Sequence, residues 1–190
     1  DGIRDVAVTG VQTCALPIYN LVYANDGTFT FNGSNSVITS PNNTIFDTQS
    51  PTVEVWIKTN ALNQNGFWFE KGSVNTEYSL FQEGTNIVWR QGSSSQYTTT
   101  ASYINTSSWA HIVGTYTPGS RKTYINGVLV TSDTASSAVG VNANGITIGS
   151  YNSGAYFYNG SIGVVRVYNR VLTAEEVQQN FNATRGRYGI

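Results

Sequence analysis

The chain has 190 residues, of which 39% are hydrophobic and 11% charged, with a formal net charge of -1. This length supports one sizeable core, and the charged fraction lies well below the roughly 25% of typical soluble domains. The sequence has neither a basic stripe suited to nucleic acid nor an apolar run near the roughly 18 residues that span a bilayer, which excludes a nucleic-acid partner and membrane insertion.

The polar surface must come from uncharged residues, mainly Asn, Ser, Thr, Gly, Gln and Tyr. This mixture is poor for helices and suits strands joined by turns. It is also common on extracellular and virion proteins. The single cysteine, Cys14, has no partner in the chain for an internal disulfide.

Residues 1–18 (DGIRDVAVTGVQTCALPI) resemble the in-frame translation of a sequencing adapter. DGIRD matches one primer, Val6 and Ala7 fall at the variable index, and VTGVQTCALPI matches the read-primer segment. We therefore expect this segment, with Cys14 and Pro17, to carry no function, the native N-terminus to be missing, and residues 19–190 to form the domain. The alternative is a genuine first strand, VAVTGV.

From Tyr19 onward, short segments with alternating apolar and polar residues are separated by turn residues, a pattern typical of half-buried strands. The predicted strands are residues 28–32, 36–39, 53–58, 67–71, 78–82, 86–91, 109–116, 122–125, 128–132, 145–149 and 161–168. Residues 92–102 are either a loop or an edge strand. Asn126 and Gly127 form the strongest hairpin signal, because both tolerate positive φ.

One segment, residues 173–182 (TAEEVQQNFN), is predicted to be helical. Thr173 is the expected N-cap, and Glu176 three residues later completes a capping box. Glu175 and Glu176 lie in the first turn, where the helix dipole favours acids. Many short strands with turns every 8–12 residues predict an all-β sandwich or barrel.

Five segments in this order resemble the laminin-G-like jelly rolls of the concanavalin A-like lectin/glucanase superfamily. They are FNGSNSVI (31–38), VEVWIKT (53–59), FEKGS (69–73), WAHIVGTYTPGSRKTYINGVLV (109–130) and GSIGVVRVYNRVLTAEEV (160–177). The resemblance implies a two-sheet antiparallel jelly-roll β-sandwich with one short C-terminal helix. The ending QNFNATRGRYGI (179–190) is similar to the tail of such modules in phage and environmental virus structural proteins.

The closing segment departs from the family pattern, because Gly163 stands where relatives usually have Asp. In many relatives, acidic side chains and backbone carbonyls on the rim hold calcium, and calcium prefers six to eight oxygen ligands. Asp26, Asp47 and Asp133 are the weak metal candidates here, each isolated in sequence. We expect no required cofactor and no high-affinity calcium site.

Catalysis on this fold would require paired carboxylates roughly 5–9.5 Å apart. Outside the helix and the first segment, no two acids lie within four positions of each other, and the E-x-D-x-x-E pattern of the superfamily's glucanases is missing. We therefore expect no enzyme, although distant acids could still meet in space. His111, the only histidine, is expected to pack rather than act as a base.

Aromatic residues carry the binding hypothesis, because their flat faces suit the apolar C–H faces of sugar rings while nearby amides bond the hydroxyls. Two groups of candidate ligand-binding residues stand out: Tyr151, Asn152, Tyr156 and Tyr158 in one segment, and Trp89, Arg90, Gln91 and Tyr97 in another. The alternative is that Trp89 and either Phe157 or Tyr158 point into the core. Trp56 and Trp109 are expected to be core residues.

The leading hypothesis is a non-catalytic carbohydrate-binding or adhesion module, located outside the cell or on a virion surface and binding a glycan or glycoconjugate. A second hypothesis is a structural or decoration domain that contacts other subunits of a virion or surface assembly. The third is a divergent polysaccharide-active hydrolase or lyase.

Overall fold

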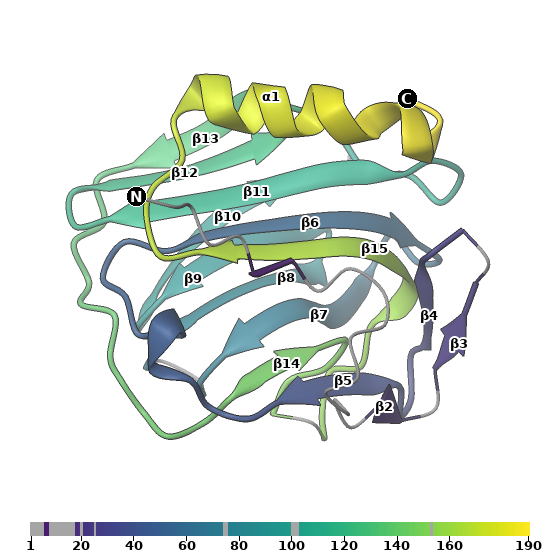
Figure 1. The fold of residues 1–190 in the computed structure, drawn as a ribbon, viewed down its shortest axis with the longest axis horizontal. Helices are drawn as coiled ribbons and strands as arrows, with labels where there is room; N and C mark the ends of the chain where they lie inside the picture. The colour runs from purple at the N-terminus through teal and green to yellow at the C-terminus, as the bar shows by residue number, and fades with distance from the viewer. Residues whose placement is uncertain are drawn as a thin grey trace.

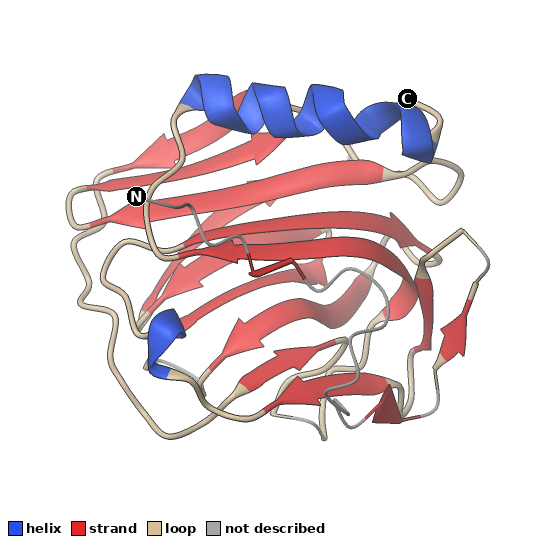
Figure 2. Cartoon of the chain, in the orientation of Figure 1, coloured by secondary structure: helices blue, strands red, loops and turns tan. Residues whose placement is uncertain are grey.

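The computed structural model describes residues 6–7, 18–19, 21–24, 26–73, 76–99, 103–152 and 154–190. Within them, two antiparallel sheets pack face to face, and one helix lies across the outer surface of one sheet (Figure 1). Strands dominate, and the helical segments are few (Figure 2). The predicted two-sheet jelly-roll sandwich with a short C-terminal helix is confirmed.

Sheet A, the larger sheet, runs in the order β13-β12-β11-β6-β15-β4-β3, and β1 pairs with β15. Its strands are β13 (Val128–Asp133), β12 (Ser120–Ile125), β11 (Ala110–Thr117), β6 (Thr52–Thr59), β15 (Asn159–Tyr168), β4 (Phe29–Asn32), β3 (Val22–Tyr23) and β1 (Val6–Ala7). The hairpin between β12 and β13 turns at the predicted Asn126 and Gly127, whose φ angles are 49° and 80°.

Sheet B runs in the order β10-β9-β8-β7-β14-β5-β2. Its strands are β10 (Ser94–Thr99), β9 (Asn86–Gln91), β8 (Tyr78–Gly84), β7 (Gln64–Lys71), β14 (Ile146–Ile148), β5 (Val37–Ser40) and β2 (Ile18–Tyr19). A short 3-10 helix, η1 (Thr44–Phe46), follows β5. The ambiguous segment at residues 92–102 therefore contains an edge strand, β10. Cys14 and Pro17 lie outside the described residues.

The core between the sheets is built from the inward-facing residues of both. Val53, Val55 and Ile57 of β6 face this core, as their alternation predicts. The residues between them, Glu54 and Trp56, are also fully buried. The prediction of a half-buried strand was wrong here, because a helix covers the outer face of sheet A.

That helix is α1 (Ala174–Thr184), and it continues into a 3-10 turn, η2 (Arg185–Tyr188). The predicted capping box is confirmed: the side chain of Thr173 accepts from the N–H of Glu176, whose side chain accepts from the N–H of Thr173. Phe181 and Tyr188 pack on Trp56, with the Tyr188 ring stacked 4.2 Å from it. No helix in the described residues is long and apolar enough to cross a membrane.

Strand β7 contains a β-bulge that positions the candidate site. Phe67 pairs with Phe81 and Phe69 with Leu80, so Trp68 is an extra residue opposite β8. Trp68 and Phe69 both pack into the core. The bulge shifts the alternation by one, and Phe67 and Glu70 consequently lie on the same outer face of sheet B.

Candidate functional site

A row of apolar side chains crosses the outer face of sheet B, on the side away from the core. Register pairs join Tyr97 of β10 to Val88 of β9, Val88 to Phe81 of β8, and Phe81 to Phe67 of β7. The rings of Phe67 and Phe81 are stacked, with centroids 4.2 Å apart and an interplanar angle of 2°. Alternation along paired strands thus brings four sequence-distant residues into one line.

A polar row lies beside it. Arg90 of β9 pairs with Ser79 of β8, and Ser79 pairs with Glu70 of β7. The Nε of Arg90 donates to the Ser79 hydroxyl at 3.2 Å, and its guanidinium carbon lies 4.9 Å from the Phe81 ring centroid. The cation therefore rests on the aromatic row, in the arrangement of a cation–π contact.

The segment between β14 and β15 covers part of this surface. Tyr151 and Ala155 form an isolated bridge, and the N–H of Phe67 donates to the carbonyl of Tyr156. The ring of Tyr151 lies 5.2 Å from that of Phe67, and the ring of Tyr156 lies 6.3 Å from it. We call this surface, formed by Phe67, Phe81, Val88, Arg90, Tyr97, Tyr151 and Tyr156, the aromatic face.

The aromatic face has a buried floor and an exposed rim. Phe67 and Phe81 are only 4% and 5% exposed, whereas Tyr97 and Tyr156 are each 55% exposed. The backbone of Tyr156 has a φ of 48°, a left-handed conformation that is uncommon for a bulky residue. Strained backbone of this kind tends to occur where the surrounding structure positions a side chain for a task.

Glu70 is the buried carboxyl of this surface, with 1% of its area exposed. Its Oε2 accepts from the backbone N–H of Asn152 at 2.8 Å, while its Oε1 has no hydrogen-bond partner among the described residues. Burial raises the pKa of Glu70 to about 7, against the lowering effects of the Asn152 N–H and the Arg90 charge. Its charge therefore changes near neutral pH.

The structure brings together five of the eight predicted ligand-binding residues. Arg90 and Tyr97 from the second predicted group meet Tyr151, Asn152 and Tyr156 from the first at the aromatic face. The contact between the two groups runs through Phe67 and Phe81, which sequence reasoning missed. Strand alternation could have revealed Phe81, because its neighbour Leu80 faces the core.

The other three predicted residues lie in the interior, which corrects the prediction for them. Trp89, Gln91 and Tyr158 are each 0% exposed. Trp89 fills the space left by Gly114 and donates its indole N–H to the Thr115 carbonyl at 3.0 Å. Trp89 and Gln91 flank Arg90 on one strand, and adjacent strand residues point to opposite faces.

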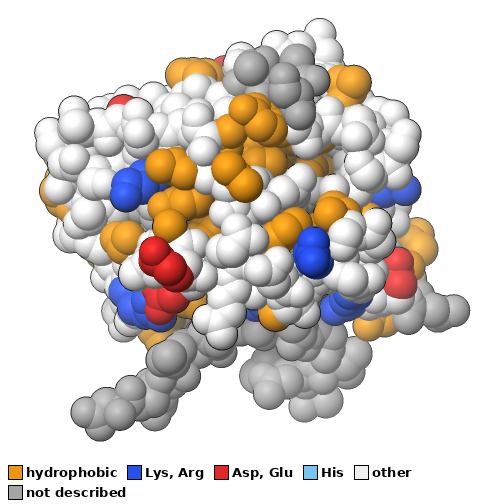
Figure 3. All heavy atoms as spheres, turned by 90° about the horizontal axis from the view of Figure 1, so that it is seen from above, with side chains coloured by type: hydrophobic (Ala, Val, Ile, Leu, Met, Phe, Trp, Pro, Cys, Tyr) orange, Lys and Arg blue, Asp and Glu red, His pale blue; other side chains and the backbone are white. Residues whose placement is uncertain are grey.

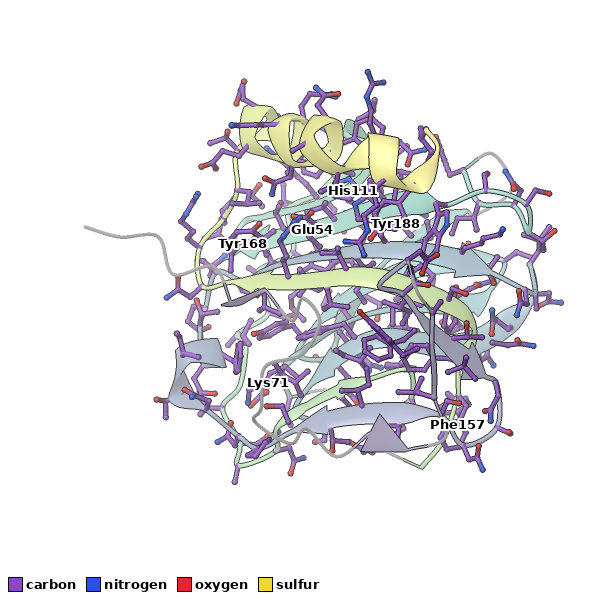
Figure 4. The ribbon with its side chains drawn as sticks, turned by 45° about the vertical axis from the view of Figure 1, so that its right-hand side comes forward. Glu54, Lys71, His111, Phe157, Tyr168 and Tyr188 are labelled. Carbon is purple, nitrogen blue, oxygen red and sulfur yellow. The ribbon has the colours of Figure 1, made fainter. Side chains whose placement is uncertain are left out.

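A second polar cluster lies between sheet A and α1, where Glu54, His111, Tyr168 and Tyr188 are grouped (Figure 4). Glu54 receives four partners: Arg166, the His111 Nε2 at 3.1 Å, the Asn180 amide at 2.8 Å and the Tyr168 hydroxyl at 3.3 Å. Burial alone would raise the pKa of Glu54, but these bonds and charges bring it below its usual value. His111 is fully buried, which agrees with its predicted packing role.

The two tryptophans expected in the core lie in the same layer. Trp56 is 0% exposed and donates its indole N–H to Thr184, but it packs under α1 rather than between the sheets. Trp109 is partly buried beside Tyr188.

Each of the three aspartates considered for a metal already has partners. Asp47 contacts the buried ammonium of Lys71 at 3.2 Å, and Asp133 binds the Arg121 guanidinium at 2.7 Å. Asp26 accepts from the backbone and the hydroxyl of Thr28. In the part of the chain that the structure describes, no group of three or more His, Cys, Asp or Glu side chains is arranged to hold a metal ion.

Lys71 also brings two distant carboxylates together. Its ammonium contacts Glu77 at 2.8 Å as well as Asp47, and it donates to the carbonyl of Asn144. Because Lys71 is 1% exposed, these carboxylates converge on a buried cation rather than on an open cleft.

The family described as the concanavalin A-like lectin/glucanases superfamily, with a laminin-G-type pattern, matches residues 32–178. No curated protein sequence matches the chain significantly.

Several solved structures share the fold. The binding domain of botulinum neurotoxin serotype D aligns with a TM-score of 0.68 and 19% identity, over 96% of this chain and 47% of that one. The binding domain of Paraclostridial Mosquitocidal Protein 1 aligns with a TM-score of 0.69 and 22% identity, over 92% of this chain and 47% of that one. A structure of botulinum neurotoxin type C, a toxin whose cell entry depends on interaction with two ganglioside molecules, aligns with a TM-score of 0.65 and 17% identity, over 95% of this chain and 46% of that one. The chain therefore spans less than half of each of these structures.

Proposed function

Because the chain belongs to the concanavalin A-like lectin/glucanase superfamily, we propose that it is a non-catalytic carbohydrate-binding module whose ligand occupies the aromatic face. The observation that carries this proposal is the aromatic row itself: Tyr151 and Tyr156 lie against the stacked Phe67–Phe81 pair at one end, and Tyr97 lies at the other end beyond Val88. Sugar rings have apolar C–H faces that lie flat on aromatic rings, and tyrosine adds a hydroxyl that can bond a polar neighbour. A glycan would lie between the exposed rims formed by Tyr97 and Tyr156.

Polar groups next to the rings supply the orientation that a sugar needs. The exposed side chain of Asn152 and the half-buried guanidinium of Arg90 border the aromatic face. A few convergent polar groups around an apolar surface are typical of ligand sites.

The arrangement of carboxylates supports binding without catalysis. Glu70 and Glu83 are the acids on the outer face of β7 and β8. Glu83 lies four residues along β8 from Ser79, the partner of Glu70, which is roughly 13 Å at strand spacing. Glycosidase carboxyls lie roughly 5–9.5 Å apart.

The structural neighbours support the same class of function. Two of them are binding domains, of botulinum neurotoxin serotype D and of Paraclostridial Mosquitocidal Protein 1, and the third is described through the interaction of botulinum neurotoxin type C with two ganglioside molecules during cell entry. We propose on this basis that the chain acts outside the cell; the virion location stays a prediction.

A glycan-array screen followed by calorimetry tests this function with the Tyr156→Ala variant. Loss of the exposed ring should weaken binding of a glycan hit about tenfold or more, as expected for one aromatic contact of about 1.4 kcal/mol. Tyr23→Ala is the matched control, because Tyr23 is 50% exposed on β3 of the other sheet. A folded protein that binds no glycan, or a hit that Tyr156→Ala leaves unchanged, would contradict the proposal.

A second candidate function, contact with a protein neighbour, has one observation in its favour. Seen from the side of α1, apolar side chains gather across the middle of the surface (Figure 3). On β13, the edge strand next to α1, Val128 and Leu129 are 61% and 46% exposed. Exposed apolar patches often mark protein contacts. If this function holds, Val128→Ser combined with Leu129→Ser should abolish a self-association or partner interaction that sedimentation detects in the native chain.

A further inference from the structure

The guanidinium of Arg90 has unused hydrogen-bonding capacity. Arginine carries five N–H donors, and here Nε donates to Ser79. The terminal Nη1 and Nη2 groups make no hydrogen bond or ion pair within the described ranges of the chain. The Phe67 and Phe81 rings, 5.6 and 4.9 Å from the guanidinium carbon, fix its position without satisfying these donors.

Arg90 is also the only cation among the described outer-face side chains of β7 to β10. The other described side chains on this face of the four strands are aromatic, aliphatic, uncharged polar or, at Glu70 and Glu83, acidic. A single positive charge thus lies among aromatic rings, between the exposed Tyr97 and the segment that carries Tyr156.

The acid closest in register offers Arg90 only partial neutralisation. Glu70 lies in the same row two strands away, so the two backbones are roughly 10 Å apart. Its carboxyl is bonded by the Asn152 N–H, and near pH 7 it is only partly ionised, because burial raises its pKa to about 7. The charge of Glu77 opposes the ionisation of Glu70, and the charge of Arg90 favours it. The residues that pair with Glu70 on the neighbouring strands, Ser79 and Thr147, are uncharged.

We propose that the aromatic face selects acidic saccharides, and that a carboxylate or sulfate of the sugar binds the free Nη edge of Arg90. The planar guanidinium matches the paired oxygens of such a group and forms two parallel charge-assisted bonds with it. The sugar ring that carries the acid then lies against Tyr97 or Tyr156. This specificity rests on the proposed carbohydrate-binding function.

Glu70 makes the selection depend on pH. At pH 6 its carboxyl is mostly neutral and leaves the charge of Arg90 available. At pH 8 it is ionised, repels an anionic ligand and competes for the guanidinium. Acidic saccharides should therefore bind more tightly at pH 6 than at pH 8.

The experiment uses the full chain and calorimetry with three sets of oligosaccharides of equal length: oligogalacturonates, sulfated carrageenan fragments and neutral galacto-oligosaccharides. We expect at least one acidic set to bind tenfold or more tightly than the neutral set, and the two acidic arms identify the anion. Arg90→Gln should remove this preference, and Arg90→Lys should restore only part of it, because lysine keeps the charge but lacks the fork. Lys122→Gln, on sheet A, removes one positive charge elsewhere and should keep the preference.

Two further variants separate the inference from the proposed function. Glu70→Gln should abolish the difference in acidic-saccharide affinity between pH 6 and pH 8, and circular dichroism checks that each variant folds. Equal affinity for acidic and neutral sets, with binding still weakened about tenfold in Tyr156→Ala, would overturn the acidic specificity and leave the carbohydrate-binding function standing. Absence of binding to every set would overturn both.

Discussion

The two sheets carry similar outer faces that are completed in different ways. Each presents a buried glutamate among aromatic side chains: Glu54 on sheet A and Glu70 on sheet B. Glu54 is covered by α1, receives hydrogen bonds from a guanidinium, an amide and a hydroxyl, and contacts an imidazole nitrogen. Glu70 is covered by a short loop and receives one backbone N–H.

The ionisation of the two acids reflects this difference. The pKa of Glu54 lies below its usual value, whereas that of Glu70 is raised to about 7. A buried carboxyl that is fully paired stabilises its charge, and one that lacks partners tends to lose it. The charge of Glu54 on sheet A is therefore paired within the chain, while Glu70 and Arg90 on sheet B retain unused hydrogen-bonding capacity, which is what a binding surface requires.

The largest expected effect comes from removing the charge of Glu54, under α1 on sheet A. Glu54→Gln leaves the Arg166 guanidinium next to a neutral amide, and breaking a buried ion pair typically costs about 3 to 5 kcal/mol. Urea unfolding should show a loss of about 3 kcal/mol, because Arg166 retains some access to solvent. Glu83→Gln, at an exposed glutamate, should change stability by less than about 0.5 kcal/mol. Equal losses in both variants would show that the cluster under α1 is not a structural unit.

The next effect is the pH dependence of stability contributed by Glu70. The folded protein binds its proton more tightly than the unfolded chain, so this group stabilises the fold at low pH. That contribution, on the order of 3 kcal/mol, should be lost as pH rises from 4.5 through about 7. Unfolding free energies measured at pH 5 and pH 8 should differ less in Glu70→Gln than in the native chain. An unchanged difference would place the titrating group elsewhere.

The smallest effect tests the cover of sheet A. The Thr173 hydroxyl accepts from the Glu176 N–H at 3.2 Å, and loss of such a cap costs about 1 kcal/mol. Thr173→Ala should lower the unfolding free energy by that amount, while Thr173→Ser should preserve it. Glycan binding should be the same in both variants, since α1 covers only sheet A; weaker binding in Thr173→Ala alone would show that the two faces are coupled.

The fold was predictable because its signals are local. Alternation placed Val53, Val55 and Ile57 inward, and turn chemistry placed the hairpin at Asn126 and Gly127. The burial of Glu54 and Trp56 was not predictable from their strand, because the helix that covers them comes more than 100 residues later.

The site was only partly predictable, for two physical reasons. The alternation of β9 buries Trp89 and Gln91 in the interior and turns Arg90 to the outer face, so these three neighbouring residues could not share one surface. The two predicted groups also meet only because β7, β8, β9 and β10 pair side by side in the sheet. The order and register of these strands cannot be predicted from the residues of any one of them.

The bulge in β7 has a consequence for how the length of this strand can vary. Removing one residue from the pair Trp68 and Phe69 would give a regular strand that keeps Phe67 and Glu70 on one face, at the cost of core volume. Straightening the strand at unchanged length, with Phe67 kept on the outer face, would instead exchange Glu70 and Lys71 between the surface and the interior. A deletion would thus be an ordinary packing defect, while loss of the bulge at constant length would reverse the sign of the charge displayed in the row of Arg90 and with it the ligands that the surface can accept.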